Sequence, residues 1–286
     1  AVYLGGKIFG MRANPSNFGK EELKETEEIL YVKLNQGRKK EFRTLTQLIK
    51  RDGNVWAEKK PLCPEAEEFV AGLEKIGRQT EQNGFANLPC RYQNHGIVYP
   101  LLQGKTLENR IRELVKKGRK ESILDMLKSM YESIFAQRVK LPDYQTETFR
   151  EVFGNCQGKE YYECVRPANI DLICANMFEE DGTYKIIDYE WTFDFAVPVA
   201  FIMWRLTNEL YYRIPQLGAL VERETLNQEF GIADSDEEIF RSWTMHFVYT
   251  YVGSDSLDPY RKEKIPVNLS DIVRKYHDKE RLHCKL

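Results

Sequence analysis

Three extended segments follow one another between residues 29 and 60, and they constrain the fold more than any other part of the chain. The segments are "ILYVKL", "FRTLTQLI" and "VWAEKK", which alternate in polarity or are rich in β-branched and aromatic residues. The turn-like "GRKKE" separates the first two, and "KRDGN", with the Asp-Gly pair typical of a tight hairpin, separates the last two. The pattern predicts a three-stranded antiparallel meander.

One helix is expected beside this sheet. In "PEAEEFVAGLEKIGRQTEQ", apolar residues recur at helical spacing behind Pro64, a residue favoured in the first helical turn. The next segment, "GIVYPLLQGKTLE", combines an extended apolar stretch, a break at Gly104 and a helix that starts near Thr106, whose hydroxyl can cap it. We interpret this segment as a crossover between two lobes.

The remainder of the chain is mostly helical in pattern. Apolar residues recur at helical spacing in "ESILDMLKSMYESIFAQR", "AFIMWRLTNELYYRI", "DEEIFRSWTMHFVYTYV" and "LSDIVRKYHDK". The exception is a predicted hairpin, in which "DLICANMF" and "YKIIDYEW" form two short strands joined by "EEDG". The fold class is therefore α+β with two lobes. The first, residues 1–98, holds the sheet and one helix, and the second, residues 99–286, is helical and holds the hairpin.

Composition excludes several classes of function. With 42 basic and 44 acidic residues, the net charge of -2 gives no general attraction for nucleic acid or an anionic membrane. The six scattered cysteines lack metal-site spacing and indicate free thiols in a reducing compartment. No signal peptide is visible, and the most apolar run, "FAVPVAFIMWRL", is short and interrupted by Pro198 and Arg205, so we expect a cytoplasmic protein without a transmembrane segment.

The hairpin carries three polar side chains whose chemistry belongs together. Two strands joined by a tight turn bring Asn176 close to Asp188, with Asp171 at the mouth of the same hairpin. Amide and carboxylate oxygens suit Mg²⁺, which also binds substrate phosphates. A second carboxylate nearby can accept a proton from an incoming hydroxyl. This arrangement fits phosphoryl transfer.

These residues also carry a resemblance to a known superfamily. An Asp and an Asn spaced as D-x-x-x-x-N, followed by two hydrophobic residues and an Asp, resemble the catalytic and metal-binding segments of the protein-kinase-like superfamily. "IIDYEW" is closer to its aminoglycoside phosphotransferase and choline kinase branch, which places an acidic residue and an aromatic after the metal-binding Asp. "KKPLCPEAEEF" and "KIIDYEWTFDFAVPVAFIMWR" are similar to kinase-like regions of bacterial surface-polysaccharide (lipopolysaccharide-type) enzymes, often beside glycosyltransferase or methyltransferase domains. The resemblance covers residues 29–205.

The resemblance implies a bilobal protein-kinase-like fold with ATP and Mg²⁺ as cofactors. It implies that Asp171 is the catalytic base, Asn176 the second metal ligand and Asp188 the principal Mg²⁺ ligand. "VWAEK" resembles the strand that supplies the phosphate-binding lysine. Since strand side chains alternate, Lys59 shares the nucleotide-facing side with Ala57, and Lys60 points the other way.

Two further parts of the nucleotide site follow from the same resemblance. The lysine needs a glutamate from the helix, and the helical wheel favours Glu65, at the edge of the apolar face, over Glu68. "VYPLLQGKTLE" resembles the hinge of the family, which implies that the backbone from Leu101 to Gln103 hydrogen-bonds adenine.

The sequence departs from the family pattern at three places. Asn169 replaces the His before the catalytic Asp, and Tyr189 replaces the Gly after the metal-binding Asp. The loop between the first two strands has a single glycine, Gly37, in place of G-x-G-x-x-G, so the basic residues Arg38, Lys39 and Lys40 that follow it are expected to hold phosphates by charge.

The activity implied is ATP-dependent phosphorylation of a hydroxyl of a sugar or other small polyol, in bacterial envelope-glycan synthesis. The partners are the nucleotide, a small-molecule or glycan acceptor and a linked glycosyltransferase or methyltransferase. A pseudokinase or nucleotide-binding scaffold that partners a glycan-synthesis enzyme is the alternative. A protein-modifying kinase is a second rival, against which the lack of a long activation loop after Asp188 argues. The aromatic residues between residues 191 and 212 are expected to be mostly core, although such rings can stack a sugar.

Overall fold

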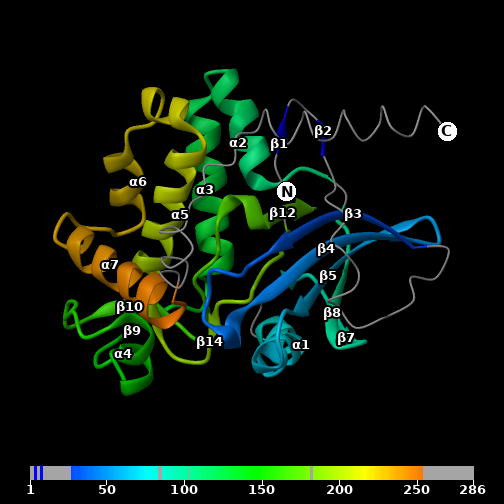
Figure 1. The fold of residues 1–286 in the computed structure, drawn as a ribbon. Helices are drawn as coiled ribbons and strands as arrows, with labels where there is room; N and C mark the ends of the chain where they lie inside the picture. The colour runs from blue at the N-terminus through cyan, green and yellow to red at the C-terminus, as the bar shows by residue number, and fades with distance from the viewer. Residues whose placement is uncertain are drawn as a thin grey trace, which may run out of the picture.

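The computed structural model describes residues 3–4, 7–8, 27–82, 86–102, 104–180 and 183–253. A twisted sheet with one helix beneath it lies on one side, and a group of helices lies on the other (Figure 1). The first two short strands, β1 (Tyr3–Leu4) and β2 (Lys7–Ile8), pair with each other. The predicted helix in "LSDIVRKYHDK" lies outside the described residues.

The predicted meander forms the greater part of the five-stranded antiparallel sheet of the first lobe. Its strands, in spatial order, are β3 (Glu27–Leu34), β4 (Thr44–Arg51), β5 (Asn54–Pro61), β8 (Gly96–Pro100) and β7 (Arg91–Gln93). Asp52 and Gly53 join β4 to β5 with φ angles of 50° and 81°. Both are left-handed, as the primed hairpin turn predicted from the Asp-Gly pair requires.

A single helix packs on this sheet, as the sequence predicts. A 3₁₀ turn, η3 (Pro64–Ala66), leads into α1 (Glu67–Gln82), which lies below the sheet in Figure 1. Val70 and Leu73 of α1 are fully buried against Ile97 of β8 and form the small core of this lobe. After α1, the short strand β6 (Ala86–Asn87) pairs in parallel with a strand of the second lobe.

The second lobe is mostly helical. Its helices are α2 (Leu107–Lys116), α3 (Lys120–Ile134), α4 (Glu147–Phe153), α5 (Val199–Arg213), α6 (Arg223–Glu229) and α7 (Asp236–Met245), which continues as the π-helix η6 (His246–Tyr251). Short strands complete it: β9 (Val139–Leu141), β10 (Tyr162–Val165), β11 (Ala168–Asn169), β14 (Thr192–Phe193) and β15 (Val197–Pro198). Thr106 caps α2 as predicted, because its Oγ1 accepts a hydrogen bond from the Asn109 amide.

The predicted hairpin is present, but its first strand starts later than expected. The two strands are β12 (Met177–Glu180) and β13 (Thr183–Ile186), and they pair antiparallel. The segment from Asp171 to β12 is not extended: the Ile173 amide bonds back to the Asp171 carbonyl, and a 3₁₀ turn, η4 (Cys174–Asn176), follows. Asp171 and Asn176 therefore lie on one folded loop, which a straight strand would not permit.

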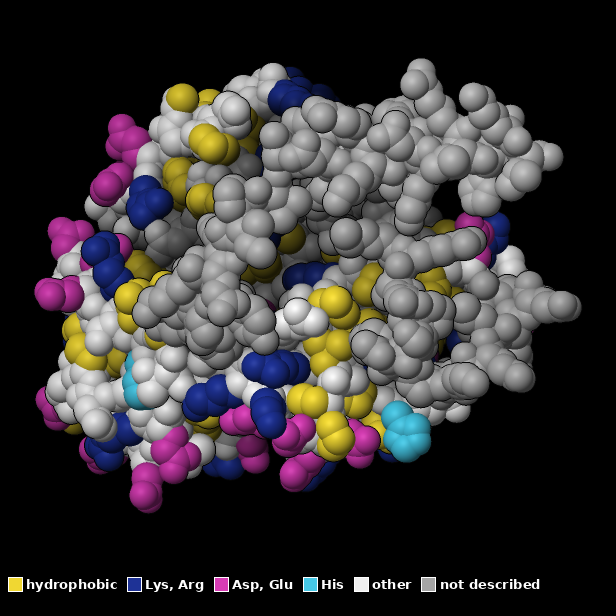
Figure 2. Space-filling view, viewed as in Figure 1, with side chains coloured by type: hydrophobic (Ala, Val, Ile, Leu, Met, Phe, Trp, Pro, Cys, Tyr) yellow, Lys and Arg dark blue, Asp and Glu magenta, His cyan; other side chains and the backbone are white. Residues whose placement is uncertain are grey.

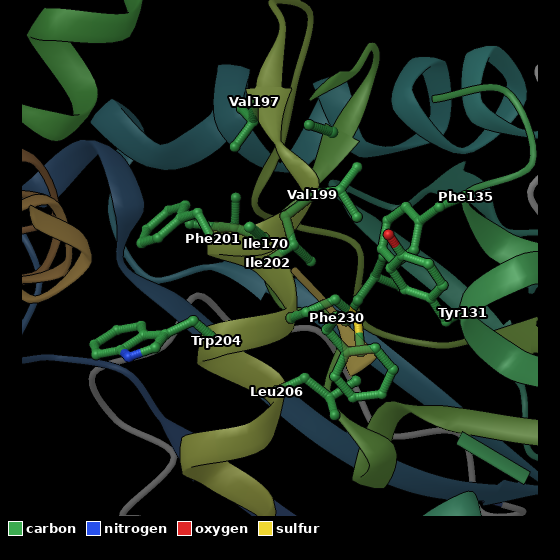
Figure 3. Close-up of a cluster of buried hydrophobic side chains, with 14 of the residues drawn as sticks. Tyr131, Phe135, Ile170, Val197, Val199, Phe201, Ile202, Trp204, Leu206 and Phe230 are labelled. Atoms are coloured by element: carbon green, nitrogen blue, oxygen red, sulfur yellow. The ribbon is translucent and has the colours of Figure 1, made fainter. Parts of the chain in front are cut away.

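The core of the second lobe is built around α5. Figure 3 shows Phe201, Ile202 and Leu206 of this helix among buried side chains from several other segments, with Ile170 beside them. Most of the predicted aromatic group is core: Trp191 is 4% exposed and Trp204 is 8% exposed, whereas Tyr212 is 82% exposed. The expectation that this group is mainly structural is therefore confirmed.

The architecture is the one that the sequence predicts. A sheet with one helix, a crossover at β8 and a helical lobe with an embedded hairpin form an α+β, bilobal, protein-kinase-like fold. Among the described residues, no helix is both long and apolar enough to cross a membrane.

Candidate active site

The two lobes meet at a buried lysine held by two carboxylates. Lys59 of β5 is 6% exposed, and its Nζ donates to Asp188 Oδ1 at 2.9 Å and to Glu190 Oε2 at 2.6 Å. Burial alone would lower the pKa of Lys59, but the two carboxylates outweigh it and raise this pKa. Lys59 is therefore a fixed positive charge beside the hairpin.

Glu190 is the functional candidate that the sequence analysis missed. Its side chain is 4% exposed and is shared between two cations, because Arg38 Nη2 donates to Glu190 Oε1 at 2.7 Å. The Arg38 guanidinium also lies 5.2 Å from the centroid of the Trp191 ring. Burial alone would raise the pKa of Glu190, but Lys59 and Arg38 lower it. The sequence feature that could have identified Glu190 is its place in "IIDYEW", two residues after Asp188.

The pairing of Glu65 with Lys59 is wrong for this structure. Glu65 lies in the 3₁₀ turn before α1, is exposed, and accepts from Lys40 Nζ at 3.0 Å. Glu68, the other candidate, is also exposed. Glu65 precedes α1 in a 3₁₀ turn, which a helical wheel does not describe, and Glu190 bonds to Lys59 in its place.

Asp171 and Asn176 are brought together by the loop before β12. Asn176 Nδ2 donates to the Asp171 carbonyl at 3.1 Å, which leaves the amide oxygen of Asn176 for another partner. Asn169, at the position of the family His, accepts from the Asp171 amide at 2.9 Å through Oδ1. Within the part of the chain that the structure describes, the buried Nδ2 of Asn169 has no hydrogen-bond partner.

The carboxylate of Asp171 is held by an arginine from α5. Arg205 Nη2 donates to Asp171 Oδ1 at 3.2 Å, and Arg205 Nε donates to the Ile170 carbonyl at 3.0 Å. Burial raises the pKa of Asp171 to about 6; Arg205 acts against this rise, while Asp188 and Glu190 add to it. Asn176, which donates to the Asp171 carbonyl, also accepts from the amide of Ile187, the neighbour of Asp188, so Asp171 and Asp188 lie in one region.

Asp188 is the exposed member of this group and has a strained backbone. Its side chain is 42% exposed and its φ angle is 58°, a left-handed value that is uncommon outside glycine. The following Tyr189 is buried, donates from its hydroxyl to the Leu88 carbonyl at 3.1 Å, and packs edge-on against Tyr99. Through these contacts with Leu88 and Tyr99, Tyr189 holds the backbone next to Asp188 against the first lobe.

Mg²⁺ suits the donor set of this region. Asp188 offers a carboxylate and Asn176 an amide oxygen, both hard ligands. Among the described residues, no group of three or more His, Cys, Asp and Glu side chains forms a complete metal site. A bound Mg²⁺ would therefore depend on phosphate oxygens in addition to these residues.

The loop between β3 and β4 reaches across to the second lobe. Arg38 enters the acidic region, whereas the exposed Lys39 donates its amide to the Val252 carbonyl at 2.8 Å and packs its side chain on Gly253. Phe42, in the turn η2 (Lys40–Phe42), lies 5.3 Å from Trp191 between ring centroids. Of the three basic residues predicted to hold phosphates, Arg38 shares Glu190 with Lys59, whereas Lys40 pairs with the exposed Glu65.

The segment predicted to be the hinge follows β8. The Leu101 amide bonds to the Val55 carbonyl at 3.4 Å, and its side chain is 38% exposed. Gln103 lies outside the described residues.

The described side chains on the face shown in Figure 2 carry both signs of charge. In Figure 2, acidic and basic side chains are interspersed over the visible face. This mixture agrees with the net charge of -2.

The fold is protein-kinase-like, and within it Lys59 of the sheet is bonded to Asp188, which follows the hairpin. No family model matches the sequence, and no curated protein matches it. The structure is similar to macrolide 2'-phosphotransferase type I, with 14% identity, 78% of this chain and 86% of that chain covered, and a TM-score of 0.39. It is also similar to choline kinase LicA from Streptococcus pneumoniae, with 13% identity, 81% and 87% covered, and a TM-score of 0.43. A third similar structure is a Plasmodium vivax ethanolamine kinase, with 12% identity, 82% of this chain and 75% of that chain covered, and a TM-score of 0.37.

Proposed function

We propose that this chain is an ATP- and Mg²⁺-dependent phosphotransferase that acts on a hydroxyl group of a small molecule. The observation that carries the proposal is the hydrogen bond of 2.9 Å between Lys59 and Asp188, since it joins a phosphate-binding cation to a metal-binding acid across the two lobes. Phosphoryl transfer needs mainly positioning and charge stabilisation, which such a group supplies.

The nucleotide is bound by the sheet lobe and the hinge. Lys59 and Arg38 provide positive charge for the phosphates, with Lys39 further along the same loop. The backbone at Leu101 and Gln103 hydrogen-bonds adenine. The assignment of Lys59 to the phosphates is supported by its two carboxylate partners, which raise its pKa and keep it positively charged.

Asp188 and Asn176 would hold a magnesium ion, which when bound would neutralise charge on the transferring phosphate. Asp171 takes the proton of the acceptor hydroxyl. Because its pKa is raised to about 6, Asp171 is a stronger base than an exposed aspartate and is still ionised at neutral pH.

The acceptor is a sugar or another small polyol, and the setting is bacterial envelope-glycan synthesis in the cytoplasm, beside a linked glycosyltransferase or methyltransferase. Support comes from the motif "KIIDYEWTFDFAVPVAFIMWR" and from its similarity to kinase-like regions of surface-polysaccharide enzymes.

One observation favours the alternative, a nucleotide-binding scaffold or pseudokinase that partners a glycan-synthesis enzyme. Glu190 already satisfies both Lys59 and Arg38, so the two cations that would meet the phosphates are occupied by a protein carboxylate. A scaffold would keep this network closed, whereas a kinase must open it during turnover.

The test follows ATP binding and turnover in one preparation. Thermal unfolding with Mg-ATP measures binding, and labelled ATP offered with a panel of sugars and polyols measures transfer. We expect Mg-dependent stabilisation, transfer to a member of the panel, and a loss of rate of about 10²- to 10⁴-fold in Asp171→Asn with nucleotide binding retained. Binding without transfer or ATP hydrolysis would favour the scaffold, and absence of binding would exclude both functions.

A further inference from the structure

Arg205 is the one charged side chain of α5 that reaches the proposed base. It makes two different bonds there: Nη2 to the Asp171 carboxylate at 3.2 Å and Nε to the Ile170 carbonyl at 3.0 Å. The side chain is only 16% exposed, and its guanidinium lies 5.6 Å from the centroid of the Phe247 ring. Arg205 is thus fixed from both sides.

The helix that carries Arg205 is rigidly placed. Ile202 and Leu206, which flank Arg205 along α5, are 0% and 1% exposed and belong with Ile170 of the loop to one buried cluster, part of which Figure 3 shows. Helix and loop are therefore packed together through apolar contacts, and Arg205 adds directed polar contacts at the same junction.

The carboxylate of Asp171 has two oxygens with different surroundings. Arg205 bonds Oδ1, and among the described residues no other side chain donates to this carboxylate. The planar guanidinium fixes direction as well as charge, because two of its N–H groups point at partners one residue apart in the chain.

We propose that Arg205 is a positioning residue that holds the carboxylate of Asp171 in one orientation, committing Oδ1 to itself and leaving Oδ2 to take the proton of the acceptor hydroxyl. This inference rests on the proposed function of Asp171. Arg205 binds neither nucleotide nor metal in this arrangement, so its loss affects the transfer step more than ATP binding.

The experiment measures Mg-ATP hydrolysis, with water as the acceptor, in variants of the full chain. Arg205→Gln is expected to lower kcat on the order of 10- to 100-fold, with KM for ATP unchanged, because a displaced base is costly even over short distances. Arg205→Lys keeps the charge but cannot reproduce both directed bonds, so its kcat falls between those of Arg205→Gln and wild type.

Arg213→Gln is the matched control. Arg213 lies at the end of the same helix, about 12 Å along the axis from Arg205, and pairs with Glu209 at 2.5 Å and with Glu108 at 3.8 Å. Its kcat is expected to equal that of wild type. A wild-type kcat in Arg205→Gln would overturn the inference. A Lys variant no better than the Gln variant, with kcat, KM and melting temperature all impaired together, would also overturn it by showing a purely structural role.

Failure of the proposed function has a different signature. If the wild type neither binds nor hydrolyses Mg-ATP, the phosphotransferase proposal fails whatever the variants do. A crystal structure of Arg205→Gln then decides the positioning claim by itself: a reoriented Asp171 carboxylate supports it, and an unchanged carboxylate overturns it.

Discussion

Lys59 Nζ lies 2.9 Å from Asp188 Oδ1, although the two residues are 129 positions apart in the chain. Lys59 belongs to the central strand of the sheet, and Asp188 follows the hairpin of the helical lobe. The bond therefore joins the two lobes directly. Lys59 is almost fully buried, whereas the Asp188 side chain is 42% exposed. The lysine is therefore anchored, and the aspartate remains accessible to a ligand.

Replacing Lys59 by Met should lower kcat/KM for ATP by about 10²- to 10³-fold, the usual cost of removing a group that stabilises charge in the transition state. Lys60→Met is the matched control, since Lys60 is the next residue, points to the other side of β5 and lies near Glu58. Steady-state kinetics with Mg-ATP provide the measurement. Equal losses of kcat/KM in both variants would show that Lys59 has no specific role in the site.

The sequence was sufficient for those parts of the site that depend on local pattern. Alternation identified the strand of Lys59, and the hairpin placed Asn176 near Asp188. The contact between Arg38 and Glu190 spans 152 residues and depends on how the β3–β4 loop docks on the other lobe, which no local period encodes. The predicted pairing of Glu65 with Lys59 was wrong for a related reason. A helical wheel describes an α-helix, but residues 64–66 form a 3₁₀ turn.

Asp188→Ala should abolish the magnesium dependence of ATP stabilisation. At an ATP concentration a hundredfold above Kd, binding to wild type contributes about 2.7 kcal/mol to the free energy of unfolding. The variant should fold, because Asp188 is exposed and Lys59 retains Glu190. Thermal unfolding with ATP, with and without EDTA, measures the difference. Asp194→Ala, which removes an exposed partner of Arg166, should keep the wild-type response; persistence of that response in Asp188→Ala would argue against Asp188 as the metal ligand.

Glu190→Gln should lower the free energy of unfolding by about 3 kcal/mol, because it leaves Arg38 without its buried carboxylate and Lys59 with only one. Arg38→Gln should cost less, since Glu190 still has Lys59. Urea unfolding of both single variants and the double variant forms a thermodynamic cycle. We expect a coupling free energy of about 1–2 kcal/mol; strict additivity would show that the ion pair contributes nothing.

Two glycines of α1 offer a paired test of how Tyr189 is packed. A Cβ at Gly72 meets no atom within 4 Å, so Gly72→Ala should stabilise the protein by about 0.5–1 kcal/mol through helix propensity alone. A Cβ at Gly77 would lie 2.9 Å from the Tyr189 hydroxyl, which is itself bonded to the Leu88 carbonyl. Gly77→Ala should therefore destabilise the protein by about 1–3 kcal/mol.

The Gly77 variant should also weaken the magnesium dependence of ATP stabilisation, because Tyr189 is the direct neighbour of Asp188 and a shifted ring moves the backbone that carries the carboxylate. Thermal unfolding of both variants, with and without Mg-ATP, separates the two effects. A Gly77→Ala protein that is stabilised as much as Gly72→Ala would mean that Tyr189 has room to move, and that it does not fix the position of Asp188.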